Sequence, residues 1–341
     1  MFLYLTKNAL QINKEGWTIV VTDNETKITR KIPFNTIEWV VIFGRIQLTT
    51  DVITSFLKAK TPVFFLSKFG WYFWKLDSLD IKNVELLYKH IEASMDEEIS
   101  FLYAKKLINA KVSNSIVMLK RWARFDMTMK WELQKFTEII DELKLYLVKI
   151  INAESKDSLR WYEWSASKLY FKWFSMFLKE PFVFTIRSRR PPLDEVNAMM
   201  SLWYTLLAQT IQMILSIQWI ESQLWFFHKP KDLKSLLVLD MMEMYRSWII
   251  DDMVIRITQR EKMKLYEHFF INTKDEKRPV LITDEWLQIF LSEYYKTVFS
   301  KADEENFGNF KKLTLIEKDL ESFKQSLVNK MPEKYEGFKI K

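Results

Sequence analysis

Short runs of apolar and β-branched residues, separated by polar turns, fill the first 80 residues of the chain. Runs of this length and composition are typical of β-strands. The predicted strands are Phe2–Leu5, Trp17–Val21, Lys27–Ile32, Glu38–Phe43, Val63–Leu66 and Trp71–Leu76. Asp23-Asn24 predicts a hairpin turn between two of them, and Lys68-Phe69-Gly70 predicts another.

A single helix is predicted inside this β-rich part. Thr49 or Thr50 caps its start, an apolar stripe follows at helical spacing, and Thr61-Pro62 ends it. The stripe consists of Val52, Ile53, Phe56 and Leu57.

The spacing of apolar residues changes after Asn83. From Val84 to about Asn329 they recur every three and four positions with few breaks, which is typical of amphipathic helices. The boundary between the two patterns falls near residues 78–84. The sequence therefore predicts an α+β protein with a β-rich domain over 1–80 and a larger all-α domain over 84–330. A basic tail over 331–341 is expected to fray.

One predicted helix is long enough to cross a membrane. No charged residue occurs from Val196 to Ile220, and this length spans a bilayer. Polar side chains nevertheless recur along the whole stretch, so a helix buried inside the helical domain explains it better. The N-terminus also lacks the pattern of a signal peptide. We expect a cytoplasmic protein without a membrane partner.

Composition excludes several classes of site. The 341 residues include no cysteine, which excludes a disulfide scaffold, a zinc–thiolate site, an iron–sulfur cluster and a cysteine nucleophile. Three histidines leave little room for a histidine-rich metal cage. Lysine and arginine number 51 against 44 aspartates and glutamates, a net charge of +7. This mild excess suits a polyanionic partner without requiring one.

Three segments of the predicted helical domain carry candidate catalytic residues. Glu163 lies near the start of one helix, and His228 lies where an apolar helix ends. Asp240 and Glu243 stand three positions apart, on one helix face bounded by Leu and Met. Carboxylates in an apolar helix cost free energy unless a cation pairs with them. Mg²⁺ or Mn²⁺, held by two carboxylates and one imidazole, would meet this need.

Simpler roles exist for the same residues. Asp240 and Glu243 could pair with Arg246 or Lys234. The role of Glu163 could be limited to complementing the helix dipole. His228 could cap a helix end or be a satisfied surface group. Spacing alone does not justify a metal site.

An arginine-rich segment gives a candidate contact for nucleic acid. Arg187, Arg189 and Arg190 precede a Pro-Pro turn, where they could clamp a phosphate. On charge alone, a solvated loop whose arginines pair with nearby acids is an equally good interpretation.

The order of these segments resembles the CRISPR-associated spacer-acquisition integrase family, the larger of the two universal CRISPR adaptation proteins. The order is Glu163, then R-x-R-R-P-P-x-D-x-x-N-A at 187–198, then His228, then S-L-x-x-L-D-x-x-E-x-[FY]-R at 235–246. Further similarities in the N-terminal half are Leu3-Tyr4-Leu5, Ile32-Pro33, Ile37-Glu38, Val41–Gly44 and the turn that holds Phe69, Gly70 and Tyr72. The resemblance runs from about residue 2 to 300.

The resemblance implies a function and a site. It implies a homodimer that pairs through its β-rich domains, with Mg²⁺ or Mn²⁺ held by Glu163, His228 and Glu243 and supported by Asp240. Such proteins cleave DNA and join protospacer 3′-hydroxyls to CRISPR repeat phosphates by metal-dependent transesterification. A small partner protein bridges two dimers, and double-stranded DNA is the substrate. His228 could instead, or also, shuttle a proton.

The sequence departs from the family at one residue type. Average usage of about 7% would give roughly 24 glycines, whereas the chain has 5 glycines and 14 tryptophans. Tryptophan stands where the family usually has glycine at Trp74, Trp161, Trp164, Trp203, Trp219, Trp225 and Trp286. We expect Trp161 and Trp164 to crowd Glu163. Ser247 also replaces a proline that is usual in the family.

These tryptophans suggest that the written sequence differs from the one made in the cell. Our hypothesis is that many of them are glycines encoded by UGA, which some bacteria read as glycine. UGG codons at 161, 164, 219 and 225 would refute it. The alternative is a tryptophan-rich protein whose packing compensates.

Two other functions are compatible with the sequence. One is a catalytically inactive DNA-binding scaffold of the same fold, which the tryptophans beside Glu163 favour. The other is a helical RNA-binding protein that stacks bases on aromatic side chains. Most of the aromatic residues lie on apolar stripes, which is more typical of a protein core.

Overall fold

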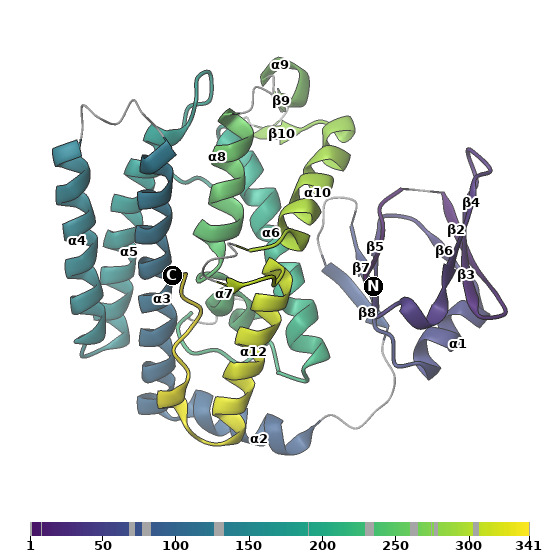
Figure 1. Ribbon diagram of the computed structural model, residues 1–341, viewed down its shortest axis with the longest axis horizontal. Helices are drawn as coiled ribbons and strands as arrows, with labels where there is room; N and C mark the ends of the chain where they lie inside the picture. The colour runs from purple at the N-terminus through teal and green to yellow at the C-terminus, as the bar shows by residue number, and fades with distance from the viewer. Residues whose placement is uncertain are drawn as a thin grey trace. The chain divides into compact units, whose positions relative to one another are not determined.

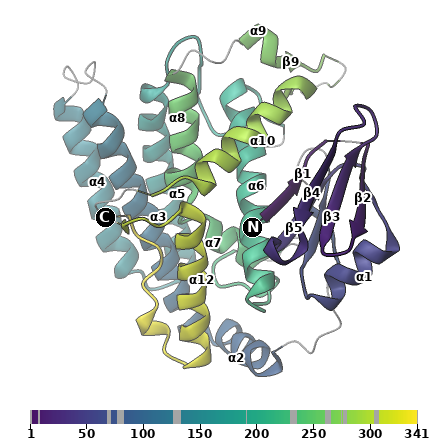
Figure 2. The same ribbon diagram turned by 45° about the vertical axis from the view of Figure 1, so that its right-hand side comes forward.

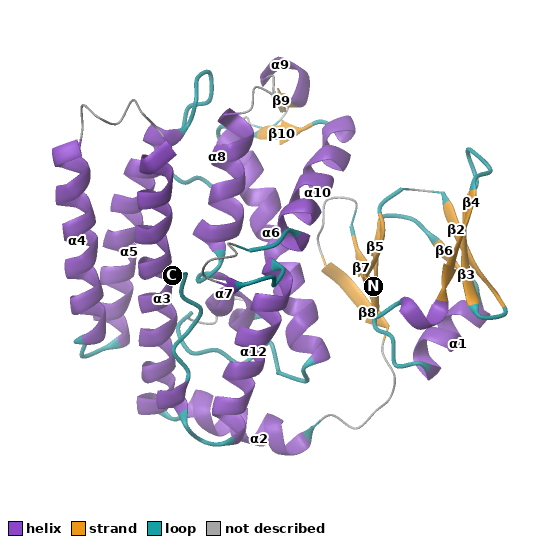
Figure 3. Cartoon of the chain, in the orientation of Figure 1, coloured by secondary structure: helices purple, strands orange, loops and turns teal. Residues whose placement is uncertain are grey.

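The computed structural model describes most of the chain, and its elements follow the predicted order of strands and then helices (Figures 1 and 3). The α+β fold class is confirmed. The chain divides into two compact units, Met1–Lys82 and Asn83–Lys341. The described residues are 2–7, 9–67, 72–76, 83–125, 133–189, 191–228, 235–259, 265–273, 275, 279–302 and 307–340.

The N-terminal unit contains two four-stranded sheets. One has the order β1-β5-β7-β8 and the other β4-β3-β2-β6. The strands of the first sheet are β1 (Phe2–Leu5), β5 (Trp39–Phe43), β7 (Val63–Leu66) and β8 (Tyr72–Leu76). Those of the second are β2 (Leu10–Glu15), β3 (Thr18–Asp23), β4 (Thr29–Pro33) and β6 (Gln47–Leu48). In the first sheet β1, β5 and β7 run parallel, and β8 runs antiparallel to β7.

Both sheets and helix α1 (Thr50–Lys58) share one core. Val52 and Phe56 of α1 are buried among side chains such as Val40 and Val63 of the first sheet and Ile19 of the second. Figure 2 shows α1 beside the strands of this unit. Two residues of the apolar stripe predicted for this helix, Val52 and Phe56, therefore pack in the core that both sheets share.

The six predicted strands are found with small shifts at their ends, but two strands were missed. In β2 only Ile12 is buried, and Lys14 and Glu15 give the segment a polar composition. The other missed strand, β6, is only two residues long. The turn predicted at Lys68-Phe69-Gly70 lies outside the described residues.

The second unit is built mainly of helices. They are α2 (Val84–Met95), α3 (Glu97–Phe125), α4 (Leu133–Ile151), α5 (Lys156–Phe174), η3 (Ser175–Phe177), α6 (Glu195–Ile217), α7 (Leu236–Met242), the π-helical η4 (Ser247–Asp251), α8 (Asp252–Gln259), α9 (Leu265–His268), α10 (Asp284–Phe299), α12 (Lys312–Val328) and η5 (Pro332–Lys334). Side chains cap three of these helices at their starts: Asn83 accepts from Leu86 N, Ser155 from Ser158 N and Asp194 from Asn197 N. The expectation of an all-α domain is wrong in one detail, because β9 (Phe269–Ile271) and β10 (Val280–Ile282) form an antiparallel pair.

Helix α6 is the uncharged stretch that raised the question of a membrane span. Its length and composition would allow it to span a membrane, but 67% of its apolar 18-residue stretch is buried inside the helical unit. It packs against α7, η4 and α12. A core helix of this kind needs no charged face, which explains its composition.

The C-terminal tail does not fray, so that expectation is wrong. Tyr335, Phe338 and Ile340 are buried. The buried Asn114 of α3 donates from Nδ2 to the carbonyls of Met244 and Phe338, at 2.8 Å each, and accepts from Ile340 N at 2.8 Å. One asparagine therefore fixes the tail to the helical core. The sequence gives little sign of this, because the contact joins residues more than 220 positions apart.

Two of the unusual tryptophans lie in very different environments. Trp219 is the C′ residue of a Schellman motif at the end of α6, where Trp219 N donates to Ser216 O and Ile220 N to Leu215 O. Its φ of +64° is in the left-handed region that favours glycine. Trp203 is fully buried, and its Nε1 donates to the Phe290 carbonyl at 3.1 Å. The backbone supports a glycine at 219, whereas the packing at 203 uses the indole.

Paired substitutions at Trp219 test the backbone argument. We expect Trp219→Gly to be more stable than Trp219→Ala by about 1 kcal/mol, because both lose the indole and only alanine keeps the left-handed penalty. Gln218, with φ −83°, is the matched control, and there the alanine variant should be the more stable. Urea unfolding measures the free energy of unfolding of the glycine and alanine variants at both positions. Equal stability of the two Trp219 variants would contradict the argument.

Candidate active site

The candidate site is a cleft of about 970 Å³ in the helical unit. It is bordered by α3, α5, the loop before α6, and the segment that follows α7. Helix α5 begins at the Ser155 capping box, so Glu163 stands two turns inside a well-anchored helix. Helix α7 ends at Met242, and Glu243 lies in the turn before the π-helical η4. Such irregular helical segments often occur at functional sites.

Lys111 of α3 joins the two predicted catalytic glutamates. Its Nζ forms a close ion pair with Glu163 Oε1 and lies 2.7 Å from Glu243 Oε2. Ser167 Oγ also donates to Glu163 Oε1, at 3.0 Å. The structure thus brings Glu163 and Glu243 together, although they are 80 positions apart in the sequence.

Glu243 is buried between two cations. Burial alone would raise its pKa, but the Arg246 guanidinium and the Lys111 ammonium outweigh burial and hold the pKa well below its usual range. Arg246 donates to Glu243 Oε1, which is one of the simpler pairings considered from the sequence. Glu243 Oε2 accepts no hydrogen bond among the described residues, since Lys111 meets it at an ion-pair distance without hydrogen-bond geometry.

Asp240 has a different task from Glu243, although both were expected on one helix face. Its Oδ2 accepts from the backbone N–H groups of Phe226 and Phe227, at 2.8 and 3.0 Å. Its Oδ1 accepts from His228 N at 3.1 Å and lies 2.5 Å from His228 Nδ1. Asp240 therefore fixes the loop and orients the imidazole.

The Asp240 carboxylate also sets the protonation of His228. Burial opposes protonation, but the hydrogen bond and charge of Asp240 outweigh it and raise the pKa of His228. Because Asp240 holds the Nδ1 side, Nε2 is the nitrogen left for a ligand or a proton. His228 is near enough to Glu243 and Lys111 to respond to their charges.

These residues fit a divalent metal in part. Within the described chain, no three His, Asp or Glu side chains are already arranged as a metal cage. Glu163 and Glu243 nevertheless direct oxygens at one cationic group, and Glu243 Oε2 lacks a hydrogen bond. Two carboxylates that converge on one cation, one of them buried and with an oxygen that accepts no hydrogen bond, suit a hard cation.

The arginine segment is ordered around Asn197. Arg187 Nη1 donates to Asn197 Oδ1 at 2.6 Å, and Asn197 Nδ2 donates to Asp194 Oδ2 at 2.6 Å. Arg187 is thus a structural anchor as well as a residue that lines the cleft. Arg189 also lines the cleft. Arg190, like Lys234, lies outside the described residues.

Sequence reasoning missed two features of the cleft. One is Lys111. A single cation on a mostly apolar helix face was a weak indication in the sequence that an acidic partner lies opposite it. The other is a buried network in which the hydroxyls of Tyr170 and Tyr204 donate to Asp251, at 2.7 and 2.5 Å. Burial raises the pKa of Asp251 to about 6, and both tyrosines act against this rise. The Arg246 guanidinium lies 4.2 Å from the Tyr204 ring centroid, which links this network to Glu243.

Comparison with known proteins identifies the family. The family model described as CRISPR associated protein Cas1 matches residues 3–296. The chain belongs to the Cas1 family. It is 27% identical over 264 residues to a CRISPR-associated endonuclease Cas1 of Thermus thermophilus, which covers 77% of this chain and 76% of that protein. The resemblance drawn from the ordered motifs is confirmed.

Two solved structures share the Cas1 fold. A Cas1 protein from Thermotoga maritima matches with a TM-score of 0.77 at 18% identity, over 96% of this chain and 97% of that one. A chain of a Cas6-RT-Cas1–Cas2 complex matches with a TM-score of 0.80 at 21% identity. That match covers all of this chain and 36% of the other, which is much longer. At these identities the likeness concerns the fold alone.

Two tryptophans flank Glu163 in this Cas1 chain, and the expected crowding is wrong for one of them. Trp161 packs on Tyr162, is 54% exposed and does not line the cleft. Trp164 does line the cleft, and Lys168 Nζ lies 5.4 Å from its ring centroid. Only the indole of Trp164 therefore borders the space beside Glu163.

The buried ion pairs predict a specific pH dependence of stability. We expect Glu243→Gln to lower the free energy of unfolding by about 3 kcal/mol at neutral pH, because Arg246 and Lys111 lose their shared counter-charge. The folded-state pKa of Glu243 is depressed, so the wild-type advantage is present above the ordinary pKa of about 4.5 and is lost as the pH falls through the folded value. Urea unfolding of both proteins across this range measures the difference. A difference that grows below pH 4.5 would contradict the assignment, and Glu142→Gln, also in the cleft, is the control.

Proposed function

We propose that this chain is a metal-dependent DNA integrase and endonuclease of CRISPR adaptation, which joins protospacer 3′-hydroxyls to repeat phosphates by transesterification. The observation that carries the proposal is the convergence of Glu163 and Glu243 on one cationic position. The cleft that contains them is also lined by Arg187 and Arg189. The endonuclease name of the Thermus relative supports the nuclease activity.

The metal ligands in this proposal are Glu163, Glu243 and His228 Nε2, and the ion is Mg²⁺ or Mn²⁺. When bound, the ion polarises the scissile phosphate and stabilises negative charge on the attacking or leaving oxygen. Lys111 then leaves the position between the carboxylates, which its flexible stem allows. Arg246 remains the partner of Glu243 Oε1.

Other residues of the chain hold the DNA and the imidazole. Arg189 contacts backbone phosphates from the edge of the cleft, and Arg187 holds the loop that carries Arg189. Asp240 keeps the His228 ring in one orientation. If Nε2 is not a ligand, the raised pKa of His228 makes it a proton donor to the leaving oxygen.

Strand joining tests the assigned roles. Glu163→Ala or Glu243→Ala should abolish Mn²⁺-dependent joining of a duplex 3′-hydroxyl to a repeat-bearing plasmid, while leaving DNA affinity nearly unchanged, because lysines and arginines make the phosphate contacts. His228→Ala should cost as much if His228 is a ligand, and about 10²-fold to 10⁴-fold if it only moves a proton.

Glu142→Ala is the matched control, since Glu142 lines the same cleft. It should join strands at the wild-type rate. Retained joining by Glu163→Ala, or equal loss in the Glu142 variant, would overturn the assignment.

A catalytically inactive scaffold is the second candidate, and one observation favours it. Lys111 and Arg246 already neutralise Glu163 and Glu243 without any metal. Calorimetric titration with Mn²⁺ separates the two functions. Binding that is lost in Glu163→Gln supports the enzyme, and no binding by the wild type supports the scaffold.

The proposed assembly is a homodimer formed through the N-terminal unit, with a small partner protein bridging two dimers. Phe73 and Trp74 on β8 are 65% and 71% exposed. They lie on a strand at the edge of its sheet, where an apolar surface favours association. The Cas1–Cas2 complex among the solved structures supports a small partner of this kind.

Mass measurement tests the dimer. Light scattering at micromolar concentration should give twice the 41.3 kDa of one chain. Phe73→Ser should shift the mass toward one chain, whereas Phe270→Ser, the same substitution at a phenylalanine of the helical unit that is 49% exposed, should not. A wild-type mass of one chain would refute the dimer.

A further inference from the structure

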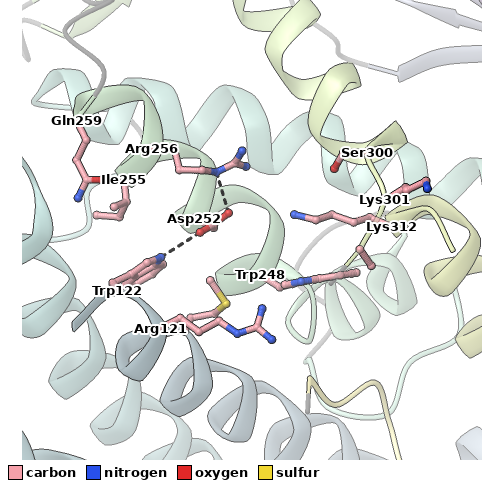
Figure 4. A pocket seen from close by; sticks show the side chains of 12 residues that line it. Arg121, Trp122, Trp248, Asp252, Ile255, Arg256, Gln259, Ser300, Lys301 and Lys312 are labelled. Carbon is pink, nitrogen blue, oxygen red and sulfur yellow. Dashed lines mark hydrogen bonds and ion pairs between the residues drawn. The ribbon is translucent and has the colours of Figure 1, made fainter. Parts of the chain in front are cut away.

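A second cavity of about 630 Å³ lies in the helical unit, between α3, α8 and the start of α12 (Figure 4). It shares no described lining residue with the catalytic cleft. The segment 247–256 contributes to both cavities from different positions. Ser247 and Asp251 line the cleft, whereas Trp248, Asp252 and Arg256 line the second cavity.

Positive charge is in excess in this cavity. Of its described lining residues, four are cationic and one is acidic. The cations are Arg121, Arg256, Lys301 and Lys312. The acid, Asp252, is already engaged, because it accepts from Trp122 Nε1 at 3.1 Å and pairs with Arg256 Nε at 2.9 Å, as the dashed lines in Figure 4 mark.

Lys312 is the unusual member of this group. Its side chain reaches across the cavity toward Asp252 (Figure 4), and it is only 8% exposed. Within the described part of the chain, its ammonium has no hydrogen bond and no ion pair, and it lies over the Trp248 ring, 5.1 Å from Nζ to the ring centroid. A buried, unpaired ammonium costs free energy.

The electrostatics of Lys312 agree with this geometry. Burial lowers its pKa to about 8; Asp252 acts against this shift, and the guanidiniums of Arg256 and Arg121 add to it. Arg256 Nη2 is also buried and has no hydrogen-bond partner among the described residues. Two donors from α8 and α12 are therefore unsatisfied in one cavity.

We propose that this cavity binds a phosphate group through Arg256 and Lys312. A phosphate oxyanion supplies the acceptors and the negative charge that both donors lack. Trp122 and Trp248 give the cavity an aromatic wall, and its volume is within the range of small-molecule sites. The phosphate belongs either to a free nucleotide or to the backbone of bound DNA. The proposal does not depend on the activity of the catalytic cleft.

Thermal unfolding with inorganic phosphate as the probe tests the site. At constant ionic strength, replacing chloride by about 20 mM phosphate should raise the Tm of the wild type, because a ligand of the folded state stabilises it. Lys312→Met should unfold at a higher temperature than the wild type without phosphate, since a buried charge is removed. The same variant should lose the phosphate-dependent rise. These two opposite effects separate a binding defect from a folding defect.

Lys296→Met is the matched control, because Lys296 is an exposed lysine on α10. It should keep the wild-type response to phosphate. No phosphate-dependent rise in the wild type, which is expected if the chain neutralises these cations itself, would overturn the proposal. An equal rise in Lys312→Met would overturn it as well.

Two further probes identify the source of the phosphate. Thymidine monophosphate and a short DNA duplex are titrated against the wild type and both variants. If Lys312→Met, unlike Lys296→Met, loses about tenfold in affinity for the nucleotide but keeps its affinity for the duplex, the phosphate belongs to a free nucleotide. If it loses affinity for the duplex and keeps that for the nucleotide, the phosphate belongs to the DNA backbone. Loss of neither affinity would contradict the site.

Discussion

The helical unit depends on how it compensates the buried charge of Glu243. This carboxylate and that of Glu163 come from different helices, and side by side they would repel each other. Lys111 lies between them, and Arg246 holds the far oxygen of Glu243. Removing Glu243 takes away the counter-charge that Lys111 and Arg246 share and leaves the buried Arg246 without its ion-pair partner, so these residues act as one unit. The same unit gives the cleft two carboxylates at a fixed separation before any substrate arrives.

The irregular segment after α7 explains how one stretch of chain serves two cavities. After α7 the chain forms a turn at 243–245, then the π-helical η4, and then the α-helix α8. A π-helical turn widens the helix and changes which residues share a face. As a result Asp251 faces the two cleft tyrosines, while its neighbour Asp252 faces Trp122 and Arg256.

The sequence predicted the parts of this molecule that depend on local patterns. Strand β5 was found because all five of its residues are apolar and buried, whereas β2 was missed because only Ile12 is buried there. Glu163, His228 and Glu243 were selected by motif order, and the structure brings the two glutamates to one lysine. The contacts of Lys111 with Glu243, like those of Asn114 with the tail, join residues that are far apart in the sequence. No periodicity or spacing could reveal such contacts.

The tryptophans show why composition has to be judged position by position. An excess of one residue type suggests a translation artefact for the whole set, but each site has its own physical requirement. At 219 the backbone conformation disfavours any side chain, and at 203 a buried indole donates to a carbonyl. The left-handed backbone at 219 therefore favours glycine, whereas the hydrogen bond at 203 favours the indole. Each tryptophan therefore has to be judged against its own backbone and contacts, and the codon at each position tests the hypothesis.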